Sequence, residues 1–288
     1  MTERRQRRRI RDRARLQNGL SIVPSLFTVG NIFCGYYAAI STLRGNYDNA
    51  AVAIGLGIVL DALDGRIARL TKTSSDFGVQ LYSIADVLTF GIAPAMLAFS
   101  WGLQSIVGIE ANIAKHVHQL GWLATFAFVV CGALRLARFN IQTKKPPDIS
   151  SKRYFVGLPI PAGAGMIASV VHFFKEPILL VGSALLWYLL ILLVAFLMIS
   201  TVRYLSFKEL DVRKPRPRRA LFMTAMLLGL IIFYSEVVLL TLAIIYVSSG
   251  PIAKLVPFSS RFAQIVRRAI ASRPEPSEPA HGNIKVNP

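Results

Sequence analysis

The chain has 288 residues, of which 53% are apolar and only 17% are charged, whereas soluble domains carry about 25% charged residues. Its net charge is nevertheless +18, from 33 Lys and Arg residues against 15 Asp and Glu residues. The apolar content excludes a disordered basic protein, and a total of two cysteines excludes a secreted disulfide scaffold. These values are typical of a protein that crosses a membrane several times and concentrates its positive charge in particular segments.

The long apolar runs predict an all-α membrane helix bundle. We expect transmembrane helices close to residues 20–43, 49–71, 79–104, 119–139, 158–174 and 177–201. A last run, about 219–249, would form a single helix of roughly 45 Å, which exceeds a hydrocarbon core of roughly 30 Å and places Glu236 at its centre. We therefore interpret it as a hairpin of two short helices, 219–234 and 237–249. This gives about eight transmembrane helices, with six or seven as the alternative.

The basic residues alternate along the chain as the positive-inside rule requires. All but three of the 33 Lys and Arg residues lie in the N-terminal tail, in every second connection with its helix ends, or in the C-terminal tail. The exceptions are Arg44, Lys115 and Lys175. Both termini are therefore expected in the cytoplasm, in a protein of the cytoplasmic membrane. The arginine-rich N-terminus suits an anionic lipid leaflet, and no nucleic-acid partner is expected, because topology already accounts for the charge.

These features divide the chain into four parts. Residues 1–19 form a basic cytoplasmic tail, 20–210 a membrane domain, and 211–250 a C-terminal transmembrane hairpin. Residues 251–288 combine an amphipathic segment, which is expected to lie in the membrane interface, with a disordered tail rich in proline.

Three carboxylates fall close together inside the apolar runs. Asp61 and Asp64 are three positions apart and share a face of the second expected helix, and Asp86 lies about two turns into the third. A charged group at membrane depth costs about 3 kcal/mol or more, so such residues are functional candidates. A cluster with oxygen ligands alone suits Mg²⁺ or Mn²⁺ rather than zinc.

Two other uses of these carboxylates stay open from the residues alone. They could form an intramembrane salt-bridge network with Arg66 and Arg69. They could also belong to a cation channel or a cation-coupled carrier, but such a path must reach both faces of the membrane. All three carboxylates are expected in the cytoplasmic half, which argues against a carrier.

The window from Asp61 to Asp86 resembles the signature of the CDP-alcohol phosphotransferases, D-x-x-D-G-x-x-A-R-x8-G-x3-D-x3-D. Seven of its eight positions match, namely Asp61, Asp64, Gly65, Ala68, Arg69, Gly78 and Asp86. Other stretches resemble the phosphatidylserine synthase branch of that family, among them 24–28, 85–94, 134–140, 155–162 and 200–208. The resemblance therefore covers about residues 20–210.

The resemblance implies transfer of the phosphatidyl group from CDP-diacylglycerol to the hydroxyl of L-serine, with CMP as the leaving group. It implies two Mg²⁺ or Mn²⁺ ions, an active site facing the cytoplasm, and a homodimer. Asp61, Asp64 and Asp86 would hold the ions, with Asp86 also the general base. The other positions that the family places around the nucleotide are Gly65, Ala68, Arg69 and Gly78, with Lys72 a weaker diphosphate contact.

Three polar residues outside the motif are further binding candidates. Arg135 and Arg138 lie three residues apart at the cytoplasmic end of the fourth expected helix. Cations at this depth favour an anionic partner, such as the carboxylate of serine or a lipid phosphate, although snorkelling at a helix end is the simpler interpretation. Asn31, near Thr28 in the first helix, could bond the cytidine or a neighbouring helix.

One position departs from the family signature. The third aspartate of the motif, a metal ligand in the family, is replaced by Tyr82. A neutral phenol there removes a carboxylate, and its ring can fill the space of a metal ion. We expect the replacement to impair an otherwise active serine enzyme. Another acceptor, glycerol phosphate or inositol phosphate, is the alternative within the family, but it should require more cations around the pocket.

Overall fold

The computed structural model describes residues 26–71, 76–103, 111–143, 154–205 and 218–255. This part of the chain is mostly helical, as the apolar runs predict. The first helix, Leu26–Leu43, is followed by α2 (Tyr47–Thr71) and by α3 (Asp76–Asp86), which continues through a π-helical turn η1 (Val87–Ile92) into α4 (Ala93–Leu103). The later elements are α5 (Ala111–Thr143), β1 (Tyr154–Val156), α6 (Ile160–Phe174), α7 (Val181–Ile199), β2 (Arg203–Leu205), α8 (Arg218–Phe233) and α9 (Ser235–Leu255).

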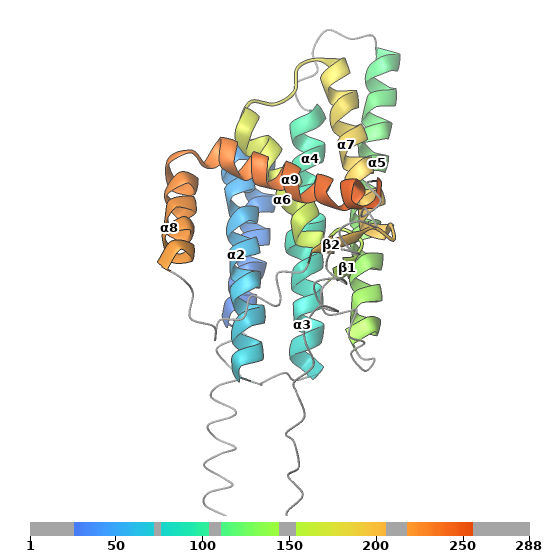
Figure 1. Ribbon diagram of the computed structural model, residues 1–288. Coiled ribbons are helices and arrows are strands. Elements are labelled where there is room, and N and C mark those ends of the chain that lie inside the picture. The colour runs from blue at the N-terminus through green and yellow to red at the C-terminus, as the bar shows by residue number, and fades with distance from the viewer. Residues whose placement is uncertain (1–25, 72–75, 104–110, 144–153, 206–217, 256–288) are drawn as a thin grey trace, which may run out of the picture.

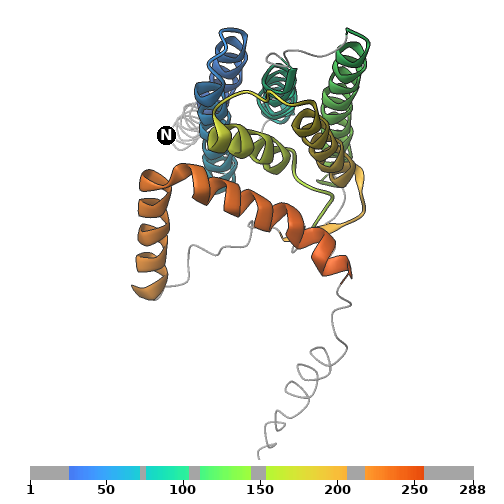
Figure 2. The same ribbon diagram turned by 90° about the horizontal axis from the view of Figure 1, so that it is seen from above.

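The long helices form a bundle that one helix crosses. Figure 1 shows α2, the continuous α3–η1–α4 rod, α5 and α7 running in roughly one direction, whereas α9 lies across them. Seen from above, α8 projects away from this bundle at the start of α9 (Figure 2). The expected break at Ser235 is confirmed, because α8 ends at Phe233 and α9 begins at Ser235. The transmembrane hairpin itself stays a prediction; in the structure α9 contacts α8 and β2 and packs most extensively against α6.

Five of the described helices are long and apolar enough to cross a membrane: Leu26–Leu43, Gln80–Gly102, Asn112–Ile141, Val181–Ile199 and Ser235–Ala253. The apolar helix α6 is shorter, at 15 residues. These findings support a helical membrane bundle. The count of eight spans and the cytoplasmic position of both termini stay predictions.

Two helix ends differ from the expected ones for local reasons. Helix α5 begins at Ala111, eight residues before the apolar run, and its first turns carry exposed polar side chains such as Lys115 and His116. Its 33 residues correspond to about 50 Å, so its ends extend beyond a hydrocarbon core. Helix α7 begins at Val181 rather than 177, and Lys175, which caps the end of α6, adopts a positive φ of 59°.

The core lies between α4, α5, α6 and α7, and the outside of the bundle is apolar too. Trp187 of α7 donates from Nε1 to the carbonyl of Ala98 in α4 at 2.9 Å, and its ring packs edge-on against Trp101. On the outer surface, Leu186 is 69% exposed and Phe196 68% exposed. An exterior lined with large apolar side chains is the surface that a lipid environment requires.

A short β-ladder joins the start of α6 to the end of α7. Strands β1 and β2 pair antiparallel, with Phe155 opposite Tyr204. Gly157, which follows β1, has φ 81°, and a Cβ there would lie 2.3 Å from the carbonyl oxygen of Met198. No other residue type fits this turn. Strand β2 also contacts α9, since the Tyr204 hydroxyl donates to the carbonyl of Val247 at 3.1 Å.

A polar cluster fastens the start of α9 to the bundle. His172, near the end of α6, bonds through Nδ1 to Asp48 of α2 and through Nε2 to the Ser235 hydroxyl at 2.9 Å. Lys175 pairs with Glu236 at 2.5 Å, and this hydrogen-bonded carboxylate raises the pKa of the Lys175 ammonium above its ordinary value. We call these five residues the polar anchor. It lies at the opposite end of α2 from Asp61, about 20 Å along the helix axis.

Candidate active site

The C-terminal half of α2 carries two carboxylates in different environments. Asp64 is buried, with 2% of its surface exposed, and its Oδ2 accepts a hydrogen bond from the Thr28 hydroxyl of the first helix at 2.6 Å. Asp61, one turn earlier, is partly buried and interacts electrostatically with Asp64. The helical spacing thus places both carboxylates on one side of α2, as expected.

Tyr82 of α3 lies against this pair. Its phenol donates to Oδ1 of Asp64 at 3.0 Å, so that hydroxyl donors occupy both oxygens of Asp64. Tyr82 is therefore directed toward the carboxylates of α2, the place where the motif resemblance leads us to expect a fourth carboxylate. A neutral hydrogen-bond donor therefore occupies the position where the family signature has a negatively charged carboxylate.

Asp86, the last residue of α3, completes the cluster. It interacts electrostatically with Asp61 and Asp64 on α2 and with Arg135 on α5. Its Oδ1 is buried and has no hydrogen-bond partner among the described residues. A buried carboxylate oxygen without a partner is costly. This atom is therefore the part of the site that best fits an incoming cation or a hydroxyl donor.

The backbone changes its winding directly after Asp86. Residues Val87–Ile92 form a π-helical turn, in which Ala93 donates its N–H to the carbonyl of Leu88, five residues earlier. Pro94 explains this turn, because it has no N–H for the carbonyl of Phe90 and its ring would clash with that carbonyl in a regular helix. Single π-turns of this kind are frequent at functional sites.

The structure separates the two candidate arginines of α5. Arg135 is buried, interacts electrostatically with Asp86, and has its guanidinium 5.6 Å from the centre of the Phe139 ring. Arg138 is exposed. Tyr246 of α9, which the sequence did not indicate, also interacts electrostatically with Arg135. Only Arg135 joins the carboxylate cluster.

The remaining candidates lie around the cluster to different extents. Gly65 follows Asp64 on α2 and Gly78 is in the first turns of α3. Asn31 is buried in the first helix, and its Oδ1 has no partner among the described residues. Ala68 and Arg69 belong to α2 but their side chains are outside the described set, and Lys72 lies outside the described residues altogether.

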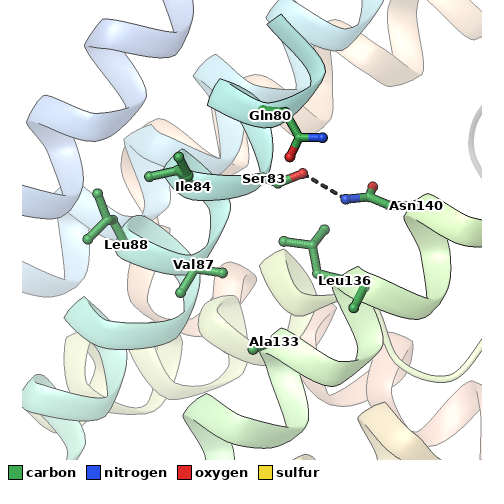
Figure 3. Close-up of a pocket in the computed structure, with 9 residues that line it drawn as sticks. Gln80, Ser83, Ile84, Val87, Leu88, Ala133, Leu136 and Asn140 are labelled. Carbon is green, nitrogen blue, oxygen red and sulfur yellow. Dashed lines mark hydrogen bonds between the residues drawn. The ribbon is translucent and has the colours of Figure 1, made fainter. Parts of the chain in front are cut away.

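A pocket that the sequence did not indicate lies between α3, η1 and α5. It has a volume of about 350 Å³ and is lined by Gln80, Ser83, Ile84, Val87, Leu88, Ala133, Leu136, Ala137 and Asn140. Figure 3 shows Asn140 of α5 reaching Ser83 of α3, to which its Nδ2 donates at 2.8 Å. The rest of the lining is mostly apolar and contains no cation, so the pocket suits an aliphatic chain rather than a phosphate.

The donor set suits a hard divalent cation, although the described side chains do not form a finished cage. Asp61, Asp64 and Asp86 offer oxygen ligands alone, and the unpartnered Oδ1 of Asp86 is available to a cation. In the described part of the chain, however, no three His, Cys, Asp or Glu side chains converge closely enough to hold an ion as they stand. Metal binding would therefore require small side-chain movements around Tyr82 and Asp64.

The sequence of this chain is similar to those of known proteins. The family model described as CDP-alcohol phosphatidyltransferase matches residues 21–185. A "CDP-diacylglycerol--serine O-phosphatidyltransferase" of Helicobacter pylori (strain ATCC 700392 / 26695) is 35% identical, over 67% of this chain and 75% of the relative. The Bacillus subtilis (strain 168) protein of that name is 38% identical, over 66% and 93% of the two chains. A Methanocaldococcus jannaschii protein of that name is 39% identical, over 54% and 63%. The chain therefore belongs to the CDP-alcohol phosphatidyltransferase family.

Proposed function

We propose that the protein is a CDP-diacylglycerol–serine O-phosphatidyltransferase, which forms phosphatidylserine and CMP at the cytoplasmic face of the inner membrane. One observation carries the proposal. The buried, unpartnered Oδ1 of Asp86 lies in a cluster of three carboxylates beside the buried Arg135. The names of the relatives support serine as the acceptor.

Two side chains have separate roles in the proposed reaction, one as general base and one in binding an anionic group. Asp86 takes the proton from the serine hydroxyl as the new O–P bond forms to the lipid-side phosphorus. The bond from that phosphorus to the CMP oxygen breaks, and CMP leaves with the bonding electrons. Arg135 holds an anionic group of a substrate, either the carboxylate of serine or a phosphate oxygen.

Asp61, Asp64 and Asp86 would hold Mg²⁺ or Mn²⁺, two ions in the expectation from the family. When bound, such an ion would supply positive charge that offsets the charge of the diphosphate and of the leaving group. Thr28 keeps Asp64 directed toward the site through its 2.6 Å hydrogen bond. Gly65, Ala68, Arg69, Gly78 and Lys72 are proposed to surround the nucleotide.

Tyr82 lowers the activity of this chain in the proposal. Its phenol bonds Asp64 and occupies space that a metal ion and a fourth carboxylate would otherwise share. We therefore expect weak metal binding and slow turnover in the native sequence, and higher values when an aspartate is restored.

The test is an assay of CMP release from CDP-diacylglycerol in detergent micelles, with serine, glycerol phosphate and inositol phosphate offered separately. The native chain and its Tyr82→Asp variant are compared, each with Mg²⁺, with Mn²⁺ and with EDTA. We expect serine-dependent release that EDTA abolishes and that Asp86→Asn removes. Release with glycerol phosphate or inositol phosphate but not with serine would overturn the assignment of the acceptor. No release with any acceptor from the Tyr82→Asp form would overturn the proposed activity.

A further inference from the structure

Thr89 occupies the centre of the π-helical turn that follows Asp86, and it has no exposed surface. Its hydroxyl donates to the backbone carbonyl of Asn31 in the first helix at 2.9 Å. In a helix interior that carbonyl also receives the N–H of residue 35, so Thr89 uses its second lone pair. The bond joins two helices through residues that are 58 positions apart in the sequence.

Two glycines leave the space that Thr89 needs. A Cβ at Gly35 would lie 2.6 Å from the Thr89 hydroxyl oxygen and 2.8 Å from its Cα. A Cβ at Gly57 of α2 would lie 2.8 Å from the Thr89 Cγ2. Separations under 3.0 Å are essentially never observed for real Cβ atoms. The turn is therefore seated between the first helix and α2 through a hydrogen bond on one side and a methyl contact on the other.

One face of the first helix contacts Asp64 on α2 and the π-turn that follows Asp86. Thr28, Asn31 and Gly35 are spaced at i, i+3 and i+7, which places them on one side of a helix. Thr28 donates a hydrogen bond to Asp64 of α2. Three residues after Asp86, Thr89 donates to the carbonyl of Asn31 and fits beside Gly35, which has no side chain. One rigid element thus sets the relative position of the two sides of the carboxylate cluster.

We propose that Thr89 is a positioning residue for Asp86. Its hydroxyl bond to the Asn31 carbonyl fixes the π-turn, and its methyl fits the space that Gly57 leaves. The π-turn in turn fixes the direction of the unpartnered carboxylate oxygen of Asp86. The role of that oxygen as general base and metal ligand rests on the proposed function. Thr89 itself touches no substrate in this proposal and acts through the backbone of the turn.

The first experiment separates the hydroxyl from the methyl of Thr89, in the Tyr82→Asp background. Thr89→Val keeps the shape and loses the donor, whereas Thr89→Ser keeps the donor. We expect Thr89→Val to raise amide hydrogen exchange at residues 87–93 and to lower kcat by about tenfold, the factor that one hydrogen bond accounts for, with KM for CDP-diacylglycerol nearly unchanged. Thr89→Ser should stay within about threefold of the parent, well inside that factor. Thr125→Val is the matched control, because that buried hydroxyl bonds within its own helix α5.

The second experiment tests the methyl contact by compensation. Gly57→Ala places its Cβ against the Thr89 Cγ2, so kcat should fall and exchange at the turn should rise. Thr89→Ser removes that methyl, so the Gly57→Ala/Thr89→Ser double variant should recover the part of the loss that the methyl causes, while the 3.1 Å approach of the new Cβ to Asn31 Oδ1 remains. Gly55→Ala on the same helix is the control, since a Cβ there meets nothing within 4 Å. A double variant no better than Gly57→Ala alone would overturn the contact.

A readout independent of turnover keeps this proposal distinct from the proposed function. Mn²⁺ affinity, measured by electron paramagnetic resonance on the Tyr82→Asp form, reports the position of Asp86 without any substrate. We expect Thr89→Val to weaken Mn²⁺ binding and Thr89→Ser to leave it unchanged. If Thr89→Val changes neither Mn²⁺ affinity nor amide exchange, the positioning role is wrong, whatever the assay of CMP release returns. Absence of CMP release together with these shifts would instead count against the reaction alone.

Discussion

The phenol of Tyr82 on α3 donates a hydrogen bond to Oδ1 of Asp64 on α2, across 3.0 Å. The bond joins the two helices that carry the carboxylate cluster, at the point where the family signature has a third aspartate. It satisfies a buried carboxylate with a neutral donor, a stable arrangement in the absence of a cation. The residue that departs from the motif is thus well accommodated and holds the cluster in a form with one carboxylate fewer.

Tyr82→Asp should therefore raise the rate of serine-dependent CMP release. The change removes the ring from the cluster and restores an anionic oxygen ligand for a divalent ion. Tyr82→Phe is the matched control, because it removes the hydrogen bond to Asp64 and keeps the ring. We expect Tyr82→Phe to leave the rate of the native chain unaltered. Equal rates for the Asp variant and the native chain would show that Tyr82 is not the impairing residue.

Asp86→Asn should lower kcat of the Tyr82→Asp form by about 10²–10⁴-fold, the contribution of a positioned general base. The amide keeps the size of the side chain, so the fold should be retained, and the unfolding temperature in detergent checks this. Asp48→Asn provides the control at the far end of the bundle, where the same loss of charge should leave kcat unaltered. A rate for Asp86→Asn within a few-fold of the parent would contradict the role of Asp86 as the base.

Arg135 and Arg138 should respond differently to the same substitution. Arg135→Gln removes a buried cation that interacts with Asp86, so we expect kcat/KM for serine to fall at least about 10²-fold. Arg138→Gln removes an exposed cation from the same helix and should change kcat/KM by less than about twofold. Steady-state assays over a range of serine concentrations measure both. Similar losses for the two variants would mean that Arg138 also contacts a substrate.

His172→Phe should destabilise the attachment of α9 without affecting the carboxylate cluster directly. The imidazole bonds both Asp48 and Ser235, and loss of two hydrogen bonds, one of them to a carboxylate, costs about 2–4 kcal/mol. We expect a lower unfolding temperature in detergent and faster amide exchange in the first turns of α9. His116→Phe, at an exposed position of α5, is the control. Unaltered exchange in α9 would show that the polar anchor does not hold this helix.

Much of the site follows from spacing along the chain. Asp61 and Asp64 face one side of α2 because three residues make nearly one helical turn, and Asp86 interacts with both of them from the end of α3. The hydrogen bond between Tyr82 and Asp64 is consistent with the expectation that the side chain of Tyr82 lies among the carboxylates. Arg135 and Arg138 look equivalent in the sequence, because both are arginines near the same end of α5. The packing of α5 against neighbouring helices buries Arg135 and leaves Arg138 exposed.

Local sequence says less about contacts between distant segments. The break between α8 and α9 was visible in Ser235 and Glu236, but the crossing of α9 over the bundle depends on the polar anchor and on the Tyr204 bond to Val247. The small ladder of β1 and β2 pairs segments nearly 50 residues apart and has no signal in either one alone. The pocket between α3, η1 and α5 likewise depends on side chains from segments that are distant in the sequence.

The sequence by itself indicated a helical membrane bundle, the carboxylates that lie inside its apolar segments, and the family to which the chain belongs. These properties depend on apolar periodicity and on motif spacing, which are local. Tertiary structure alone decided which oxygen of the cluster is unpartnered, that Thr28 and Thr89 tie the first helix to both sides of it, and that α9 lies across the bundle. Each of these depends on which helices meet, because a hydrogen bond or a methyl contact needs atoms brought within about 3–4 Å of each other.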